Sequence, residues 1–244
     1  MSIWGKLVGG AAGFALGGPL GALIGGFAGH AVDRARDGRA GRAAAGDLRE
    51  VAFTIAVIAL GAKMAKADGQ VTEDEIRAFR EVFQVPHGEV QNVARVFNLA
   101  RRDSRGFEPY AHQVGAMFRG QPAVLEKLLD GLFHIARADN VYDPREDTYL
   151  QQVARLFGFS ESDFARIREA HIGPGESDPY VILGMERGDS DDEIKTRHRQ
   201  LVREHHPDKL MAEGLPQEFV DVATQKLATI NDAWDRIQQE RGIR

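Results

Sequence analysis

Apolar side chains recur at helical spacing along most of the chain, with polar residues between them. Leu48, Val51, Ile55 and Ile58 mark one face of the first such stretch. No stretch alternates strictly between apolar and polar residues, as a half-buried strand would, and turn sequences rich in Gly, Pro and Asp separate the helical runs. The pattern predicts an all-α protein, with about seven short helices in a middle domain at residues 47–172.

The N-terminal segment is uncharged rather than amphipathic. Residues 7–32 hold no Asp, Glu, Lys or Arg, and a helix of that length spans roughly 39 Å, enough to cross a hydrocarbon core of roughly 30 Å. Its apolar content is modest, because glycine and alanine supply much of it. Glycine recurs at every fourth position, which lets two helices approach closely in lipid. These glycines are Gly9, Gly13, Gly17, Gly21, Gly25 and Gly29. We expect a transmembrane helix here, through which two copies of the chain form a homodimer.

The basic residues give this helix a direction. One lysine, Lys6, precedes it, whereas four arginines follow it in a linker at residues 33–46. An excess of Lys and Arg in short loops marks the cytoplasmic side of a membrane. We therefore expect residues 1–6 to form an extracytoplasmic tail and the bulk of the chain to be cytoplasmic. A cleaved signal peptide and a glycine-rich segment that never enters the membrane are the alternatives.

A short motif occurs twice in the middle domain. Lys66-Ala67-Asp68-Gly69 followed by Glu75 returns as Arg137-Ala138-Asp139-Asn140 followed by Glu146. Each copy lies between two apolar helical stretches, which predicts two similar helical hairpins. The pattern resembles the TerB-like helical domain over residues 47–172. That resemblance implies a module that senses metal ions or docks other proteins.

Two interpretations of the acidic residues in this motif stay open. In the first, Asp68, Glu75, Asp139 and Glu146 gather and bind a divalent cation through their carboxylate oxygens. In the second, which we prefer, the two glutamates belong to capping boxes that begin helices. An EF-hand is excluded, because the sixth position of a loop starting at Asp68 is not glycine. Apart from such a cation, we expect no cofactor.

A breaker-rich linker at residues 173–177 precedes a separate C-terminal domain at residues 178–244. Its predicted helices run over residues 178–184, 190–205 and 216–241. Pro207 cannot continue the second helix, so we predict that His206-Pro207-Asp208 is a loop at the tip of an antiparallel hairpin. On the second helix, one face carries Ile194, His198, Leu201 and His205, and another carries the basic residues Lys195, Arg199 and Arg203. We expect the third helix to place Phe219, Ala223, Leu227, Ile230, Trp234 and Ile237 toward the second.

Four motifs in this domain occur in the order that is typical of a J domain. They are Tyr180-Val181-Ile182-Leu183-Gly184, Glu193-Ile194-Lys195, His206-Pro207-Asp208-Lys209 and Ile230-Asn231-Asp232-Ala233-Trp234. The resemblance implies that His206, Pro207 and Asp208 contact a DnaK-type chaperone near its interdomain linker. It also implies that the chaperone's acidic surface meets Lys195, Arg199, Arg203 and Lys209. His205 stands where tyrosine is common in J domains.

The whole chain, with its glycine-rich segment, TerB-like domain and J domain in that order, resembles membrane-anchored DnaJ-like co-chaperones of the DjlA family. Further matching stretches are Trp4-Gly5-Lys6, Gly29-His30 and Gly214-Leu215-Pro216. The resemblance implies a single-pass protein of the bacterial inner membrane, with a periplasmic N-terminus and a cytoplasmic C-terminus. It implies recruitment of DnaK, stimulation of ATP hydrolysis and a connection to envelope-stress signalling. The alternative function is a membrane sensor or scaffold whose middle domain binds a cation or a protein.

Composition narrows these functions. The chain has a net charge of −5 and no cysteine, which disfavours binding to nucleic acid and excludes disulfides, thiol nucleophiles and cysteine-ligated zinc. Neither a phosphate-binding loop nor a catalytic triad is evident in the sequence. We therefore expect a protein that acts on a chaperone rather than an enzyme.

Overall fold

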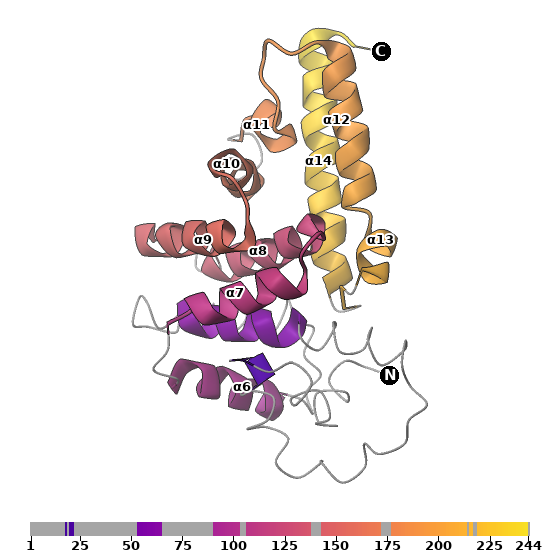
Figure 1. Ribbon diagram of the computed structural model, residues 1–244. Coiled ribbons are helices and arrows are strands. Elements are labelled where there is room, and N and C mark those ends of the chain that lie inside the picture. Colours follow the sequence, from indigo (N-terminus) through magenta and orange to yellow (C-terminus); the bar gives the residue numbers. More distant parts are fainter. Residues whose placement is uncertain are drawn as a thin grey trace.

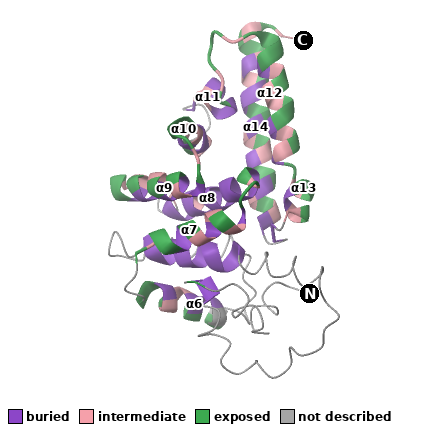
Figure 2. Cartoon of the chain, in the orientation of Figure 1, coloured by how far each residue is buried: buried purple, intermediate pink, exposed green. Residues whose placement is uncertain are grey.

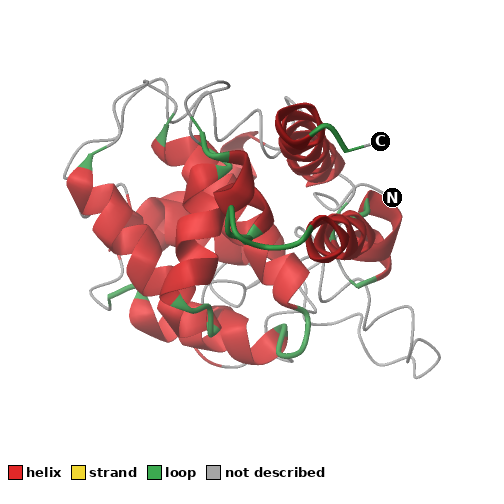
Figure 3. Cartoon of the chain, turned by 90° about the horizontal axis from the view of Figure 1, so that it is seen from above, coloured by secondary structure: helices red, strands yellow, loops and turns green. Residues whose placement is uncertain are grey.

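A computed structural model gives the fold of the chain. It describes residues 18, 20–21, 53–64, 90–102, 106–137, 143–171, 177–213, 215–216 and 219–243. Within these ranges every regular element is helical and none is a strand (Figure 3). The predicted all-α fold class is confirmed.

The middle domain is a layered bundle of helices in which α8 is central. After a helix at residues 53–64, drawn in purple in Figure 1, come α6 (Val90–Arg102), α7 (Glu108–Met117), α8 (Pro122–Ala136), α9 (Pro144–Phe157) and α10 (Glu161–Glu169). Nearly every residue of α8 is buried, on all sides of the helix (Figure 2). A helix buried all round needs further helices around it. Helices α9, α10 and the C-terminal helix α14 (Val220–Arg241) contact it.

Local hydrogen bonds set where these helices begin. Asp143 accepts a hydrogen bond from the backbone N–H of Arg145, while the carboxylate of Glu146 accepts one from the N–H of Asp143, 3.3 Å away. Together these bonds form the predicted capping box of α9. Ser160 and Asp163 form a second capping box at the start of α10.

The C-terminal domain is built on a long antiparallel pair, α12 (Asp191–Glu204) and α14, with α11 (Pro179–Leu183) packed against α14 (Figure 1). The predicted capping box at Ser190 is present and starts α12. A small core joins the three helices. Its buried members are Tyr180, Ile182, Leu183, Ile194, Leu201, Ile230, Ala233, Trp234 and Ile237.

Three details of this domain differ from the predictions. His206 lies in extended conformation, but Pro207 begins the short helix α13 (Pro207–Ala212), so the His-Pro-Asp segment is not wholly a loop. Proline suits the first helical position because its missing N–H has no helical partner there. The last helix begins at Val220 rather than near Pro216. Phe219 and Ala223 pack into the core of the middle domain instead of against α12.

Most of the predicted transmembrane helix lies outside the described residues, which include only Gly18, Leu20 and Gly21 of that segment. The backbone N–H of Leu20 donates to Oε1 of Gln113 in α7, 3.0 Å away, and Leu20 is buried with the core of the middle domain. In the part of the chain that is described, no helix is both long and apolar enough to cross a membrane. The other glycines predicted to pair two helices are likewise not among the described residues.

Candidate functional site

The His-Pro-Asp segment lies at the end of the hairpin that is closest to the middle domain, at the junction of α12 and α13 (Figure 1). His206 caps α13: its Nδ1 accepts a hydrogen bond from the backbone N–H of Asp208, 3.3 Å away. In the neutral ring this bond leaves the proton on Nε2, which is then free to donate outward. The side chains of His206 and Asp208 are 51% and 83% exposed. The segment therefore combines a fixed backbone with side chains that a partner can reach.

The predicted basic face runs along α12 toward this segment. Arg199 and Arg203 are exposed, and Lys195 is half-buried. Lys209 on α13 is also exposed and lies 3.7 Å from Glu213. The four cations and the His-Pro-Asp segment thus belong to consecutive helices, and all of them are accessible. An acidic surface of a partner is the chemistry that this set of side chains fits.

The opposite face of α12 holds it against α14. Ile194 and Leu201 are buried in the hairpin core. The ring of His198 stacks on Trp234, with centroids 5.1 Å apart, and its Nε2 lies 3.0 Å from Oδ1 of Asn231. His198 therefore packs and bonds within the hairpin.

Apolar side chains on the far side of the His-Pro-Asp segment enter the middle domain. Leu210, Leu215 and Phe219 are buried and belong to the same core cluster as the helix at residues 53–64. Phe219 meets Phe53 edge to face, with ring centroids 4.8 Å apart. The core of the middle domain therefore continues into the C-terminal domain directly beside the segment.

A buried cluster of charged groups joins the two domains. The interdomain charge cluster consists of Glu126, Lys127, Asp130, Arg166, His171, His205 and Lys226. Lys226 of α14 lies 2.9 Å from Oε1 of Glu126 and 3.1 Å from Oδ1 of Asp130, both on α8. Glu126, Asp130, His171 and Lys226 were not among the site residues predicted from the sequence.

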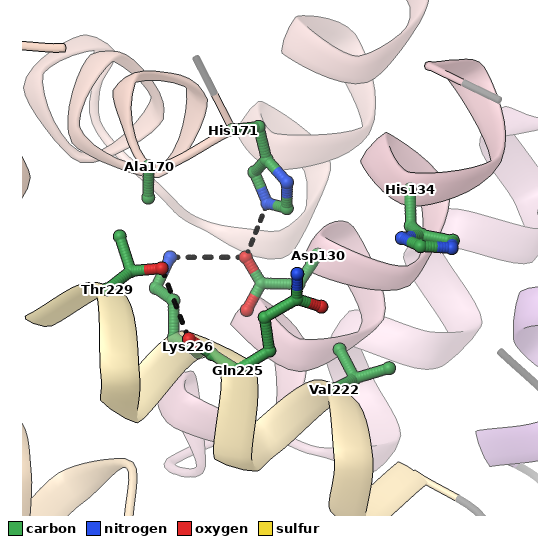
Figure 4. Close-up of a pocket in the computed structure, with 8 residues that line it drawn as sticks. All are labelled: Asp130, His134, Ala170, His171, Val222, Gln225, Lys226 and Thr229. Carbon is green, nitrogen blue, oxygen red and sulfur yellow. Dashed lines mark hydrogen bonds and ion pairs between the residues drawn. The ribbon is translucent and has the colours of Figure 1, made fainter. Parts of the chain in front are cut away.

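Each carboxylate of the cluster has several partners. Glu126 receives the guanidinium of Arg166, with Nη1 at 2.9 Å from Oε1 and Nη2 at 2.5 Å from Oε2. Asp130 accepts from Lys127 at 2.7 Å, and its Oδ1 lies 2.8 Å from Nε2 of His171. Figure 4 shows Asp130 between His171 and Lys226. Such multiple pairing is what buried charges require.

The pKa values follow from burial and from these partners. Burial acts to raise the pKa of Glu126, but the charges of Arg166 and Lys226 outweigh it and hold that pKa well below its ordinary value. Asp130 also has a pKa well below the ordinary value, because Lys127 and Lys226 outweigh its burial. Both carboxylates are therefore ionised at neutral pH.

The basic members of the cluster respond in the opposite direction. Burial lowers the pKa of Lys127 to about 8, although Asp130 favours the charged form. Burial lowers the pKa of His205 to about 3 and also lowers that of His171, against the attraction of nearby carboxylates. His205 is therefore neutral at pH 7. Its Nε2 lies 3.7 Å from Oε2 of Glu126, and among the described residues its buried Nδ1 has no hydrogen-bond partner.

A small cavity of about 70 Å³ opens at the edge of this cluster, between α8, the end of α10 and α14 (Figure 4). Its lining residues are Asp130, His134, Ala170, His171, Val222, Gln225, Lys226 and Thr229. The cavity is polar and has room for a few water molecules. It lies beside Asp130 and Lys226, where α8 meets α14.

Only one of the four predicted cation ligands is described. Glu146 is buried and bonds to the backbone of Asp143 as part of the capping box, which is the role that the preferred interpretation gave it. Asp68, Glu75 and Asp139 lie outside the described residues. Among the described residues, no group of three or more acidic or histidine side chains is arranged to hold a metal ion. The cation site remains a prediction.

An exposed His-Pro-Asp segment at the end of an antiparallel hairpin, below a basic helix, defines a J-domain protein. Residues 178–241 match the DnaJ domain family, residues 54–169 match the family of the tellurite resistance protein TerB, and residues 1–42 match the transmembrane domain of co-chaperone DjlA. These three matches confirm the resemblances that the sequence motifs indicated.

Relatives extend the match to the whole chain. The chain is 31% identical to co-chaperone protein DjlA of Photobacterium profundum, covering 99% of this chain and 100% of that one. It is 32% identical to the DjlA protein of Coxiella burnetii, covering 98% of each, and 27% identical to that of Escherichia coli K12, covering all of both. No solved structure matches significantly. The chain belongs to the DjlA co-chaperone family.

Proposed function

We propose that the chain stimulates ATP hydrolysis by a DnaK-type chaperone through His206, Pro207 and Asp208. The observation that carries this proposal is the geometry of that segment. His206 and Asp208 are exposed, yet the hydrogen bond between them and the start of α13 fix the backbone that presents them. The basic face of α12, which ends directly before the segment, supplies a charge complementary to an acidic partner.

The C-terminal domain acts on the chaperone by binding rather than by chemistry of its own. In this proposal the segment binds the hydrolysing conformation of the chaperone more tightly than the other conformation, and so shifts the population toward hydrolysis. Arg199 and Arg203 accelerate the encounter, because exposed charges mainly affect association rate and salt dependence. Catalytic acids, bases and nucleophiles remain those of the chaperone.

We further propose that the chain works at the bacterial inner membrane as a single-pass protein. Support comes from the match of residues 1–42 to a transmembrane domain and from the uncharged residues 7–32. Arginines in the linker at residues 33–46 favour a C-terminal domain on the cytoplasmic side of the membrane. A DnaK-type chaperone and ATP are found on that side. The spaced glycines would pair two copies, and a role in envelope-stress signalling would follow from this location.

Single-turnover ATP hydrolysis by a DnaK-type chaperone tests the proposed function. The full chain in detergent micelles is compared with His206→Gln and with His112→Gln, which changes an exposed histidine on α7. Stimulation by the unmutated chain and by His112→Gln, with loss of stimulation by His206→Gln, would support the proposal. If the folded, unmutated chain gives no stimulation, the proposed function is wrong.

A topology measurement tests the membrane arrangement. Reporters that are active only in the periplasm are fused to each end of the full chain and compared in living bacteria. Activity at the N-terminus alone agrees with the proposed orientation. Activity at the C-terminus would place the His-Pro-Asp segment away from ATP-loaded chaperone.

A further inference from the structure

The middle domain holds both flanks of the His-Pro-Asp segment. His205, the residue directly before it, is 1% exposed and faces Glu126 of α8. Leu210, two residues after it, is fully buried in the core of the middle domain. The amide of Leu210 donates to the carbonyl of His206, 3.1 Å away, and closes the turn that carries the segment. The exposed His-Pro-Asp segment therefore lies between two residues that are buried against the middle domain.

Glu126 is the group on which these contacts converge. Its carboxylate is 3% exposed and lies within 4 Å of Arg166 from its own domain and of Lys226 and His205 from the C-terminal domain. Lys226 also reaches Asp130, so a single ammonium group joins α14 to two carboxylates of α8. Lys226 thereby ties α14 to α8 by ion pairs, while the neutral His205 at the end of α12 packs beside the same Glu126 carboxylate.

Apolar contacts and ion pairs contribute differently to the joining of the two domains. Burial of Leu210, Phe219 and Phe53 supplies the hydrophobic stabilisation. Buried ion pairs add little net stability, because desolvation offsets their attraction, but a mispaired buried charge is costly. Glu126 and Lys226 therefore select one docked arrangement from those that the apolar contacts alone would permit.

We propose that Glu126 of the middle domain is a positioning residue for the His-Pro-Asp segment of the J domain, acting through Lys226 and His205. The proposal rests on the proposed function, because it concerns how the segment is presented to the chaperone. While the charge pairing is intact, the two domains are docked in nearly every molecule, and the segment is held ready to bind. When the charge pairing is broken, only a fraction of the molecules is docked, and the apparent affinity for the chaperone falls by that fraction.

Two buried lysines of the same cluster provide a matched pair of variants. Lys226→Met removes the cation that crosses between the domains. Lys127→Met removes an equally buried cation whose partner, Asp130, lies on the same helix. After either change Asp130 keeps a lysine and His171, and Glu126 keeps Arg166. The variants thus differ mainly in whether the lost contact joined the two domains.

Hydrogen exchange and chaperone kinetics measure the effect on the full chain in detergent micelles. For Lys226→Met we expect the Leu210 amide to exchange at least about tenfold faster, because the variant loses its contacts to both Glu126 and Asp130 and one charge-assisted hydrogen bond alone is worth about tenfold. The co-chaperone concentration that gives half-maximal stimulation rises by a smaller factor, set by the fraction of molecules that stay docked, while the maximal rate is unchanged. Lys127→Met leaves both quantities near those of the unmutated chain. Lys226→Arg, which keeps the cation, restores them.

Several outcomes would overturn the positioning role. Unchanged Leu210 exchange in folded Lys226→Met contradicts it, and so does equal loosening by Lys127→Met. Glu126→Gln keeps the shape but not the charge of the carboxylate and must act in the same direction. If these variants do not fold, exchange in the unmutated chain decides: Leu210 and Leu129 of α8 must open with the same free energy. Exchange does not need the chaperone, so failure of stimulation in the unmutated chain overturns the function separately.

Discussion

Replacement of His205 by glutamine tests the electrostatics of the interdomain charge cluster most directly. The imidazole is buried among the carboxylate of Glu126 and the cations of Lys127, Arg166 and Lys226, with Asp130 and His171 in the same cluster. Protonation would add a fourth cation to three that already face two carboxylates. The structure therefore predicts that acid destabilises the docked C-terminal domain, and that His205→Gln removes part of this sensitivity.

The sign and size follow from the two protonation equilibria of His205. Its pKa is about 3 in the folded protein and 6.5 in the unfolded chain, so between these values the unfolded chain binds more protons. The contribution of neutral His205 to the free energy of unfolding is fully present above pH 6.5 and falls as the pH decreases toward 3. The value of pH 5 lies about 1.5 pH units below the unfolded pKa, and each of these units costs about 1.4 kcal/mol. The free energy of unfolding therefore falls by about 2 kcal/mol between pH 7.5 and pH 5.

Urea unfolding followed by tryptophan fluorescence measures this loss. The chain has two tryptophans, and Trp4→Phe leaves Trp234 of the C-terminal domain as the single reporter. The free energy of unfolding is determined at pH 7.5 and pH 5 in this background, with and without His205→Gln. The glutamine variant should lose about 2 kcal/mol less than its parent over this interval. His112→Gln, on the exposed surface of α7, should behave as the parent does.

Equal acid losses in the parent and in His205→Gln would refute the reasoning, because His205 would then titrate alike in both states. A residual loss in the variant is expected. The pKa of His171 is lowered by burial and acts in the same direction over the same interval. The carboxylates of Glu126 and Asp130 contribute mainly below their unfolded pKa values of 4.5 and 3.8.

Three further changes probe the hairpin and its surface. Ile230→Ala empties a fully buried position between α12 and α14 and should cost about 2–5 kcal/mol in urea unfolding; a cost below about 1 kcal/mol would contradict this packing. Ser190→Ala removes the capping box of α12 and should cost about 1 kcal/mol in the same assay. Arg203→Gln removes an exposed cation and should slow association with the chaperone at low salt in stopped-flow measurements. An unchanged salt dependence would argue against its contact with an acidic surface.

Much of the C-terminal domain could be predicted because its signals are local. The capping box joins Ser190 to a residue three positions away, and Pro207 ends α12 through its own ring. The buried face of α12 follows from helical periodicity, as Ile194 and Leu201 show. The four motifs, in the order that is typical of a J domain, also indicated the family. The candidate residues of the His-Pro-Asp segment were therefore evident from the sequence.

The interdomain charge cluster could not be predicted in the same way. Glu126, Lys127 and Asp130 read as an ordinary polar patch on a helix, and Lys226 lies 96 residues from Asp130 in the chain. One signal is present in the sequence, because these charges interrupt a largely apolar stretch from Ala123 to Ala136. Charges within an apolar stretch indicate burial, but they do not show which residues pair with them.

The sequence by itself determined most of the C-terminal helices, the order of domains, the family and the exposed segment that we propose contacts the chaperone, because each rests on neighbouring residues or on motifs. Only the tertiary structure decided that Phe219 and Ala223 leave the hairpin core for the middle domain and that His205 faces Glu126. Periodicity states that a side chain is buried, but not against which element. That choice depends on how two domains fit and which buried charges can pair, and both are properties of the folded chain.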